Sequence, residues 1–134
     1  IEAGLKLDID DIRRAIALQR DLYRRFVKFF ETHDLLVLPT AQHPPFPVEK
    51  RYVDEINGQK LDTYVDWILI TSIITMTGCP AISIPCGFTK SGLPVGLQLV
   101  GRPRGEAALL SAAHLMEQVF GLAAQLPIDP VVRH

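Results

Sequence analysis

The chain has 134 residues, of which 14 are Lys or Arg and 15 are Asp or Glu, so its formal net charge at pH 7 is −1. This near balance gives no electrostatic reason to expect a nucleic acid or an anionic membrane as a partner. An apolar content of 48% is ordinary for a globular protein, and the length suits one domain with a modest core. No apolar run approaches the about 18 residues of a membrane span and no amino-terminal segment reads as a signal peptide, so we expect a soluble, cytoplasmic protein.

The cysteines and histidines are not spaced as metal ligands. Cys79 and Cys86 form no Cys-x-x-Cys motif, and the 4 histidines show no metal-ligand spacing. We therefore expect no metal, no cofactor and no disulfide framework. One alternative stays open, in which Cys86 is a thiol nucleophile served by His33 or His43, and it requires a base within about 3 Å of the sulfur.

The first expected element is an amphipathic helix from residue 9 to about Thr32. Acidic residues precede it and occupy its first turn, where the helix dipole favours negative charge. The basic residues lie largely off the apolar stripe, which is typical of a solvated face. The stripe itself recurs at helical spacing; it comprises Ile9, Ile12, Ile16, Leu22, Phe26 and Phe30.

A short strand and a proline-rich loop follow this helix. Residues 35–38 are continuously apolar, which predicts a strand buried on both faces, as in a parallel sheet covered by helices. Residues 44–47 contain three prolines and predict an extended surface tether rather than a polyproline ligand. Asn57-Gly58 predicts the turn of a small hairpin between Tyr52 and Leu61.

The segment 62–77 is rich in β-branched residues but is too long for a buried strand. Gly78 followed by Cys79-Pro80 is a helix stop, so we expect a helix.

Two apolar runs come next, 81–84 and 95–100, both bounded by Gly and Pro. A turn over 89–94 makes them neighbouring strands. Residues 106–120 predict a final amphipathic helix capped by Gly121, and the tail after Leu126 is expected to be irregular.

The order of glycines and apolar runs in 78–106 resembles the carboxy-terminal signature of the amidase signature family, enzymes that hydrolyse or transfer carboxamide groups. The strand ending in Pro39-Thr40, the proline-rich loop and the helix 106–120 are similar to the family as well, so the resemblance covers Gly4 to Gly121. The glycines in question are Gly78, Gly87, Gly96 and Gly101.

This resemblance implies an α/β fold: the carboxy-terminal part of an amidase-type mixed sheet covered by helices, with about three strands and three helices. Residues 1–134 are then a single partial domain. Because such a remnant leaves sheet edges and apolar faces open, we expect as partner either the missing amino-terminal part of a parent amidase or a second copy of the chain.

Family members are similar in using a serine nucleophile, a second serine in a cis peptide and a lysine, with the serines in a Gly-Ser-rich stretch far upstream of the matched region. No such stretch occurs here, so the resemblance implies a segment without catalytic residues that is inactive alone. The intact enzyme would act on a small-molecule amide. The four serines are scattered; they are Ser72, Ser83, Ser91 and Ser111.

The resemblance also places part of the helix 62–77 on the substrate channel of the complete enzyme. Trp67, Thr71 and Thr75 are its candidate substrate-binding residues, and the alternative is that they are core residues of an apolar helix. A different class of function stays open too, namely a non-catalytic interaction module that keeps the amidase-like fold.

Overall fold

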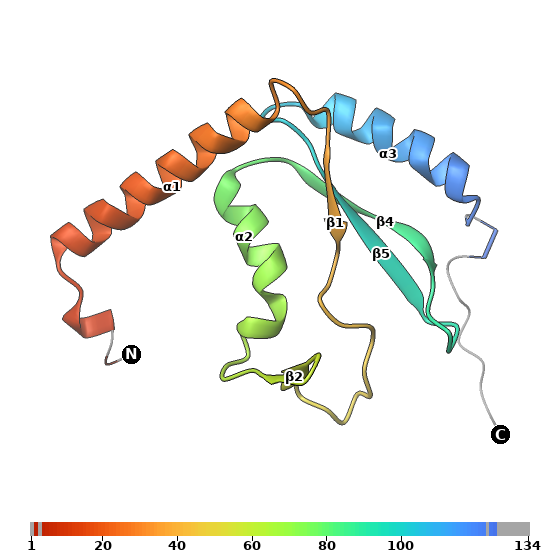
Figure 1. Cartoon of the computed structure of the whole chain (residues 1–134), viewed down its shortest axis with the longest axis horizontal. Coiled ribbons are helices and arrows are strands. Elements are labelled where there is room, and N and C mark those ends of the chain that lie inside the picture. The colour runs from red at the N-terminus through yellow and green to blue at the C-terminus, as the bar shows by residue number, and fades with distance from the viewer. Residues whose placement is uncertain (1, 3, 123, 126–134) are drawn as a thin grey trace.

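A computed structural model describes residues 2, 4–122, 124 and 125. Within them lie three α-helices, two short 3-10 helices, a three-stranded sheet and a two-stranded hairpin. The elements in chain order are η1 (Gly4–Lys6), α1 (Ile9–Phe29), β1 (Leu36–Pro39), β2 (Glu55–Ile56), β3 (Gln59–Lys60), η2 (Asp66–Ile68), α2 (Leu69–Thr77), β4 (Ala81–Phe88), β5 (Pro94–Val100) and α3 (Glu106–Phe120). The α/β fold with three helices and three main strands is confirmed (Figure 1).

Helix α1 begins at a capping box. The Asp11 N–H donates to the Asp8 carboxylate over 2.8 Å, and the Asp8 N–H donates to the Asp11 carboxylate over 3.1 Å. These bonds satisfy two backbone donors that the first turn leaves free. The helix ends at Phe29, and the Phe30 N–H still bonds to the Phe26 carbonyl, so the expected end near Thr32 was a few residues late.

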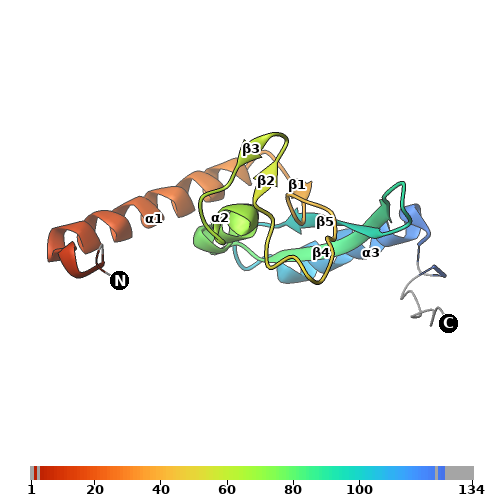
Figure 2. The same ribbon diagram turned by 90° about the horizontal axis from the view of Figure 1, so that it is seen from below.

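The apolar stripe of α1 divides into a packed half and an exposed half. The carboxy-terminal half contacts α2, and Tyr23 lies beside Gly78. At the other end, Ile9 and Ile16 are 68% and 62% exposed. Figures 1 and 2 both show α1 running away from the sheet, so among the described residues nothing covers its first turns.

The three main strands run in the order β1-β5-β4, and both pairs are antiparallel. The expectation that residues 35–38 lie in a parallel sheet and are buried on both faces is therefore wrong. Strand β1 is an edge strand, and its residues alternate in burial, with Val37 46% exposed. A run of four apolar residues is too short for its pattern to separate these two situations.

Strand β4 continues to Phe88, past the expected end at Ile84. Pro85 fits because β4 lies at the other edge of the sheet, where the missing N–H breaks no ladder bond on the outer side. A register shift between Pro85 and Gly87 accommodates the extra residue.

Helix α3 covers one face of the sheet and forms the core with it. Ile84 of β4 and Leu99 of β5 are buried against Leu109 and Ala113 of α3. Both the bounds 106–120 and the Gly121 cap, with φ of +63°, are as expected.

Helix α2 is shorter than expected. The segment 62–65 is not helical, because the Asp66 carboxylate accepts the backbone N–H groups of Asp62 and Thr63 over 3.1 and 2.8 Å and holds a turn there. This local bonding competes with helix formation. Its end is as expected: Gly78 takes a left-handed conformation, with φ of +68°, that a side chain would strain.

A hydroxyl bridge connects the outer strands across β5 on the face away from α3. Thr40, directly after β1, and Ser83 of β4 have their hydroxyl oxygens 2.6 Å apart. Gly96 of β5 lies beneath them, and the Thr40 N–H donates to the Gly96 carbonyl over 3.1 Å. A Cβ on Gly96 would lie 2.8 Å from the Thr40 oxygen and 2.9 Å from the Ser83 oxygen, so the bridge requires glycine there.

We predict that Leu99→Ala lowers the free energy of unfolding by about 2–5 kcal/mol, because it opens a cavity between β5 and α3. Ile16→Ala should change it by no more than about 0.5 kcal/mol, because that side chain is exposed and alanine favours a helix. Urea denaturation followed by circular dichroism measures both. Equal losses would mean that the exposed half of α1 is packed.

We also predict that Gly96→Ala destabilises the chain by about 1–3 kcal/mol, because the methyl group enters the space of two hydroxyls. Gly4→Ala is the matched control, since nothing lies within 4 Å of a Cβ at that position. In a chain that also carries Thr40→Ala and Ser83→Ala, the cost of Gly96→Ala should fall, as a double-mutant analysis would detect. An unchanged cost would show that the hydroxyls are not the obstacle.

Candidate functional site

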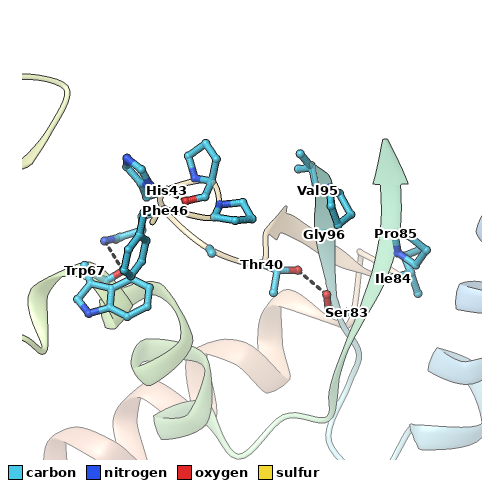
Figure 3. A pocket seen from close by; sticks show the side chains of 14 residues that line it. Thr40, His43, Phe46, Trp67, Ser83, Ile84, Pro85, Val95 and Gly96 are labelled. Carbon is cyan, nitrogen blue, oxygen red and sulfur yellow. Dashed lines mark hydrogen bonds between the residues drawn. The ribbon is translucent and has the colours of Figure 1, made fainter. Parts of the chain in front are cut away.

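A groove of about 650 Å³ lies on the face of the sheet away from α3. Its walls come from three separate parts of the chain: the loop 40–46, Trp67 of η2, and the facing parts of β4 and β5. Figure 3 shows the rings of Phe46 and Trp67 on one side and the strand residues Val95 and Pro85 on the other. The volume falls within the range of about 300–1,000 Å³ usual for small-molecule sites.

Aromatic rings in edge-to-face contact form one wall. The rings of Phe46 and Trp67 are 5.5 Å apart at 87°, and those of Tyr64 and Trp67 are 6.0 Å apart at 86°. Tyr52 extends the series against Tyr64 at 6.0 Å. This geometry is the favourable one for aromatic pairs, so the wall has a defined shape.

Gln42 fastens the loop to η2. Its side-chain amide donates to the carbonyl oxygens of Asp66 and Trp67 over 2.9 and 3.2 Å. These bonds hold the loop that carries His43 and Phe46 against the residue at the centre of the aromatic wall.

His43 is held by its own loop. Its Nδ1 lies 2.6 Å from the Pro44 carbonyl oxygen, which can only accept, so Nδ1 carries a proton in this contact. In the neutral ring, Nε2 is then an acceptor. On the strand side, the Thr40 and Ser83 hydroxyls of the bridge line the groove.

Two buried polar atoms have no hydrogen-bond partner within the described part of the chain. One is the indole Nε1 of Trp67 and the other is Oε1 of Gln98, which is the register partner of Ser83. Such a group costs about 1–3 kcal/mol when it stays unpaired. Trp67 lines the groove, and Gln98 is paired with Ser83, which also lines it.

A second groove, of about 740 Å³, lies on the other side of Ala41 and Gln42. In contrast to the first, its lining includes charged residues: Lys60, Asp62 and Asp66. The Asp66 carboxylate is already occupied by two backbone N–H groups.

In the loop that precedes the hairpin, Lys50 Nζ lies 2.6 Å from the Asp54 carboxylate. The hydrogen bond from Lys50, followed by the Asp54 backbone N–H and the charge of Lys50, holds the pKa of Asp54 below its ordinary value. Any stabilisation from this pair is present above the ordinary pKa of 3.8 and is lost as pH falls through the lower folded value. Both side chains are exposed, so the pair orders the loop more than it stabilises the fold.

Of the three candidate substrate-binding residues, Trp67 alone lines the first groove. The Thr71 hydroxyl donates to the Ile68 carbonyl over 2.7 Å, and the Thr75 hydroxyl donates to the Thr71 carbonyl over 3.1 Å. Both threonines lie farther along α2. Their contact with a substrate stays a prediction.

Among the groove residues, the sequence indicated no site role for Thr40, Gln42 or Phe46 and a role for His43 only as a base for Cys86, because residues 44–47 were expected to be a surface tether. No local pattern in the sequence brings these residues together, because they meet Trp67 and β5 only once β1 pairs with β5.

Cys86 does not form a thiol–imidazole pair in the structure. Its sulfur lies 3.5 Å from the Val95 carbonyl, His33 Nδ1 lies 3.1 Å from the Phe29 carbonyl, and His43 bonds to Pro44.

Among the described residues, no group of three or more His, Cys, Asp or Glu side chains is arranged to hold a metal ion. The helices of this part of the chain are all too short or too polar to cross a membrane.

Comparison with known proteins identifies the family. The family model described as "Amidase" matches residues 5–110. The chain is 36% identical over 115 residues to a glutamyl-tRNA(Gln) amidotransferase subunit of Alkaliphilus metalliredigens (strain QYMF), a match that covers 86% of this chain and 22% of the relative. It is 36% identical over 123 residues to an acylamidase of Rhodococcus erythropolis, covering 91% of this chain and 26% of the relative.

Solved structures share the fold. A bacterial aryl acylamidase of the amidase signature enzymes superposes with a TM-score of 0.74 over 96% of this chain and 28% of its own, at 23% identity. The chain thus spans about a quarter of the length of the relatives it matches. With more than half of its residues matched by the family model and the fold in agreement, the chain belongs to the amidase family.

Proposed function

We propose that this chain is the carboxy-terminal segment of an amidase and builds one wall of its substrate pocket, while the reacting groups come from the rest of the parent protein. The groove carries this proposal, since it combines a shaped aromatic wall with hydroxyls and an imidazole. The relatives extend well beyond the matched region, which supports a larger pocket of which this groove is one part.

The hydrogen bonds of the serines support the view that the nucleophile lies elsewhere. The Ser72 hydroxyl bonds to the Ile68 carbonyl and the Ser111 hydroxyl to the Ala107 carbonyl. Ser83 and Ser91 pair with threonine hydroxyls. Within the described residues, no serine hydroxyl contacts a histidine or a lysine, the groups that activate a serine nucleophile.

The exposed apolar surfaces indicate where the remainder of the parent would pack. The first turns of α1 expose Ile9, Ile12 and Ile16, and β1 and β4 are both open edges. We propose that the amino-terminal part of the parent covers these surfaces and completes one domain with residues 1–134. A second copy of the chain or an unrelated partner, as in an interaction module, is the competing occupant.

We predict that the isolated chain hydrolyses no simple carboxamide, whereas a chimera in which it replaces the matching segment of the Rhodococcus erythropolis acylamidase turns over that enzyme's amide substrate. In the chimera, Ser72→Ala and Ser111→Ala should leave kcat within about twofold, because both hydroxyls serve only the helix backbone. Substitutions at Trp67, Thr71 or Thr75 should change the ranking of substrates rather than abolish turnover. Robust turnover by the 134 residues alone, abolished by one serine substitution, would falsify the proposal.

We further predict that Ile16→Asp prevents assembly of the chimera, since it would place a charged carboxylate in an apolar contact, while the isolated chain keeps its stability because the site is exposed there. Soluble yield and size-exclusion chromatography of the chimera, with Val119→Asp as the exposed control, measure the effect. If both variants assemble normally, the first turns of α1 are not covered by the parent. If the isolated chain is a dimer that Ile16→Asp dissociates, a second copy occupies this surface.

A further inference from the structure

We propose that the first groove binds a neutral, ring-bearing group of the amide substrate and excludes groups that carry a net charge. This inference rests on the proposed function and names the class of substrate for the same site. On this proposal, the groove binds an aromatic carboxamide and excludes a free amino acid.

The absence of charged partners in the groove wall is the first observation. Within the described residues, no Asp, Glu, Lys or Arg side chain lines it. An ionic group that enters such a site loses hydration and meets no carboxylate, ammonium or guanidinium group, which is unfavourable. His43 is the titratable side chain of the groove lining. The second groove differs in this respect, because its lining includes Lys60 and Asp62, which could pair with a charged ligand.

The shape of the walls is the second observation. The rings of Phe46 and Trp67, in edge-to-face contact, lie on one side of the groove, and Val95 and Pro85 lie on the other (Figure 3). Pro94 also lines the groove. Two apolar walls that face each other favour a flat, apolar group between them. The Gln42 hydrogen bonds to η2 fix one wall, and the antiparallel pairing of β4 with β5 fixes the other.

The third observation is the small number of polar atoms and their type. In the hydroxyl bridge one of Thr40 and Ser83 donates to the other, so one hydroxyl proton stays free to donate. When the His43 ring is uncharged, Nδ1 donates to the Pro44 carbonyl and Nε2 is an acceptor. A carboxamide matches this set because it has a carbonyl acceptor and an N–H donor and carries no net charge.

Trp67 makes the proposal testable without any catalysis. It is the single tryptophan of the chain and lies in the groove wall, so tryptophan emission from the chain reports on this groove alone. The probes are benzamide, benzoate, benzamidinium and L-glutamine, of which the first three share one ring and differ in charge.

In a titration of the full 134-residue chain, we expect benzamide to change Trp67 emission saturably. We expect at least about tenfold weaker binding of benzoate and benzamidinium, and no saturable response to L-glutamine. Benzoate, benzamidinium or L-glutamine binding as tightly as benzamide would overturn the proposal. So would the lack of any saturable response to benzamide up to its solubility limit.

A matched pair of variants locates the binding. Val95→Asp introduces a carboxylate into the groove wall, and Val119→Asp introduces the same group on exposed α3, outside the groove. The first should weaken benzamide binding at least about tenfold, and the second should leave it unchanged. Equal affinities in the two variants would contradict the assignment. If circular dichroism shows that Val95→Asp does not fold, Phe46→Ala decides: unchanged binding after loss of that ring overturns the proposal, and severalfold weaker binding supports it.

The result of the benzamide titration can be distinguished from the activity of the chimera. An inactive chimera whose benzamide binding follows the expected order would refute the role in hydrolysis but not the ligand class. An active chimera that contains the chain and still shows no preference for the neutral ring would refute the ligand class alone.

Discussion

The chain brings three strands close together at Gly96, and the position of the groove follows from this approach. Because Gly96 has no side chain, the Thr40 and Ser83 hydroxyls meet above β5 at 2.6 Å and connect the two edge strands. That contact sets where β1 ends and therefore where the loop carrying Gln42, His43 and Phe46 departs. A side chain at Gly96 would displace the loop and close the floor of the groove, so the glycine positions residues that it does not touch.

The two faces of the three-stranded sheet are buried to different extents. Helix α3 covers one face of the sheet, and Ile84, Leu99 and Leu109 form a core cluster there with Ala113. The opposite face holds the groove, the unpaired oxygen of Gln98 and open strand edges, while the first turns of α1 extend into solvent. The chain spans about a quarter of its relatives. If it packs against the remainder of a larger domain, these exposed surfaces are the ones that would be covered.

Local signals in the sequence predicted the elements well and the long-range contacts poorly. Helix α3 and its Gly121 cap, the turn between β4 and β5, and the Asn57-Gly58 hairpin all depend on neighbouring residues, and the structure confirms them. The expected start of α2 was wrong because the Asp66 carboxylate bonds to the N–H groups of Asp62 and Thr63 and holds a turn there. The parallel arrangement of β1 was wrong because four apolar residues do not reveal which strand they pair with. The groove was missed for the same reason, since residues 40–46, Trp67 and β5 meet only in the fold.

The groove is fastened by contacts that lie entirely within this chain. Gln42 ties the loop to η2, the hydroxyl bridge ties β1 to β4, and the ladder between β4 and β5 holds the far wall. These contacts fix the described walls of the groove from within this segment. Under the proposed function, the reactive groups come from another part of the parent protein. Under the proposed function, a division of this kind would let substrate preference vary through Phe46, Trp67 or Val95 while the reacting groups stay unchanged.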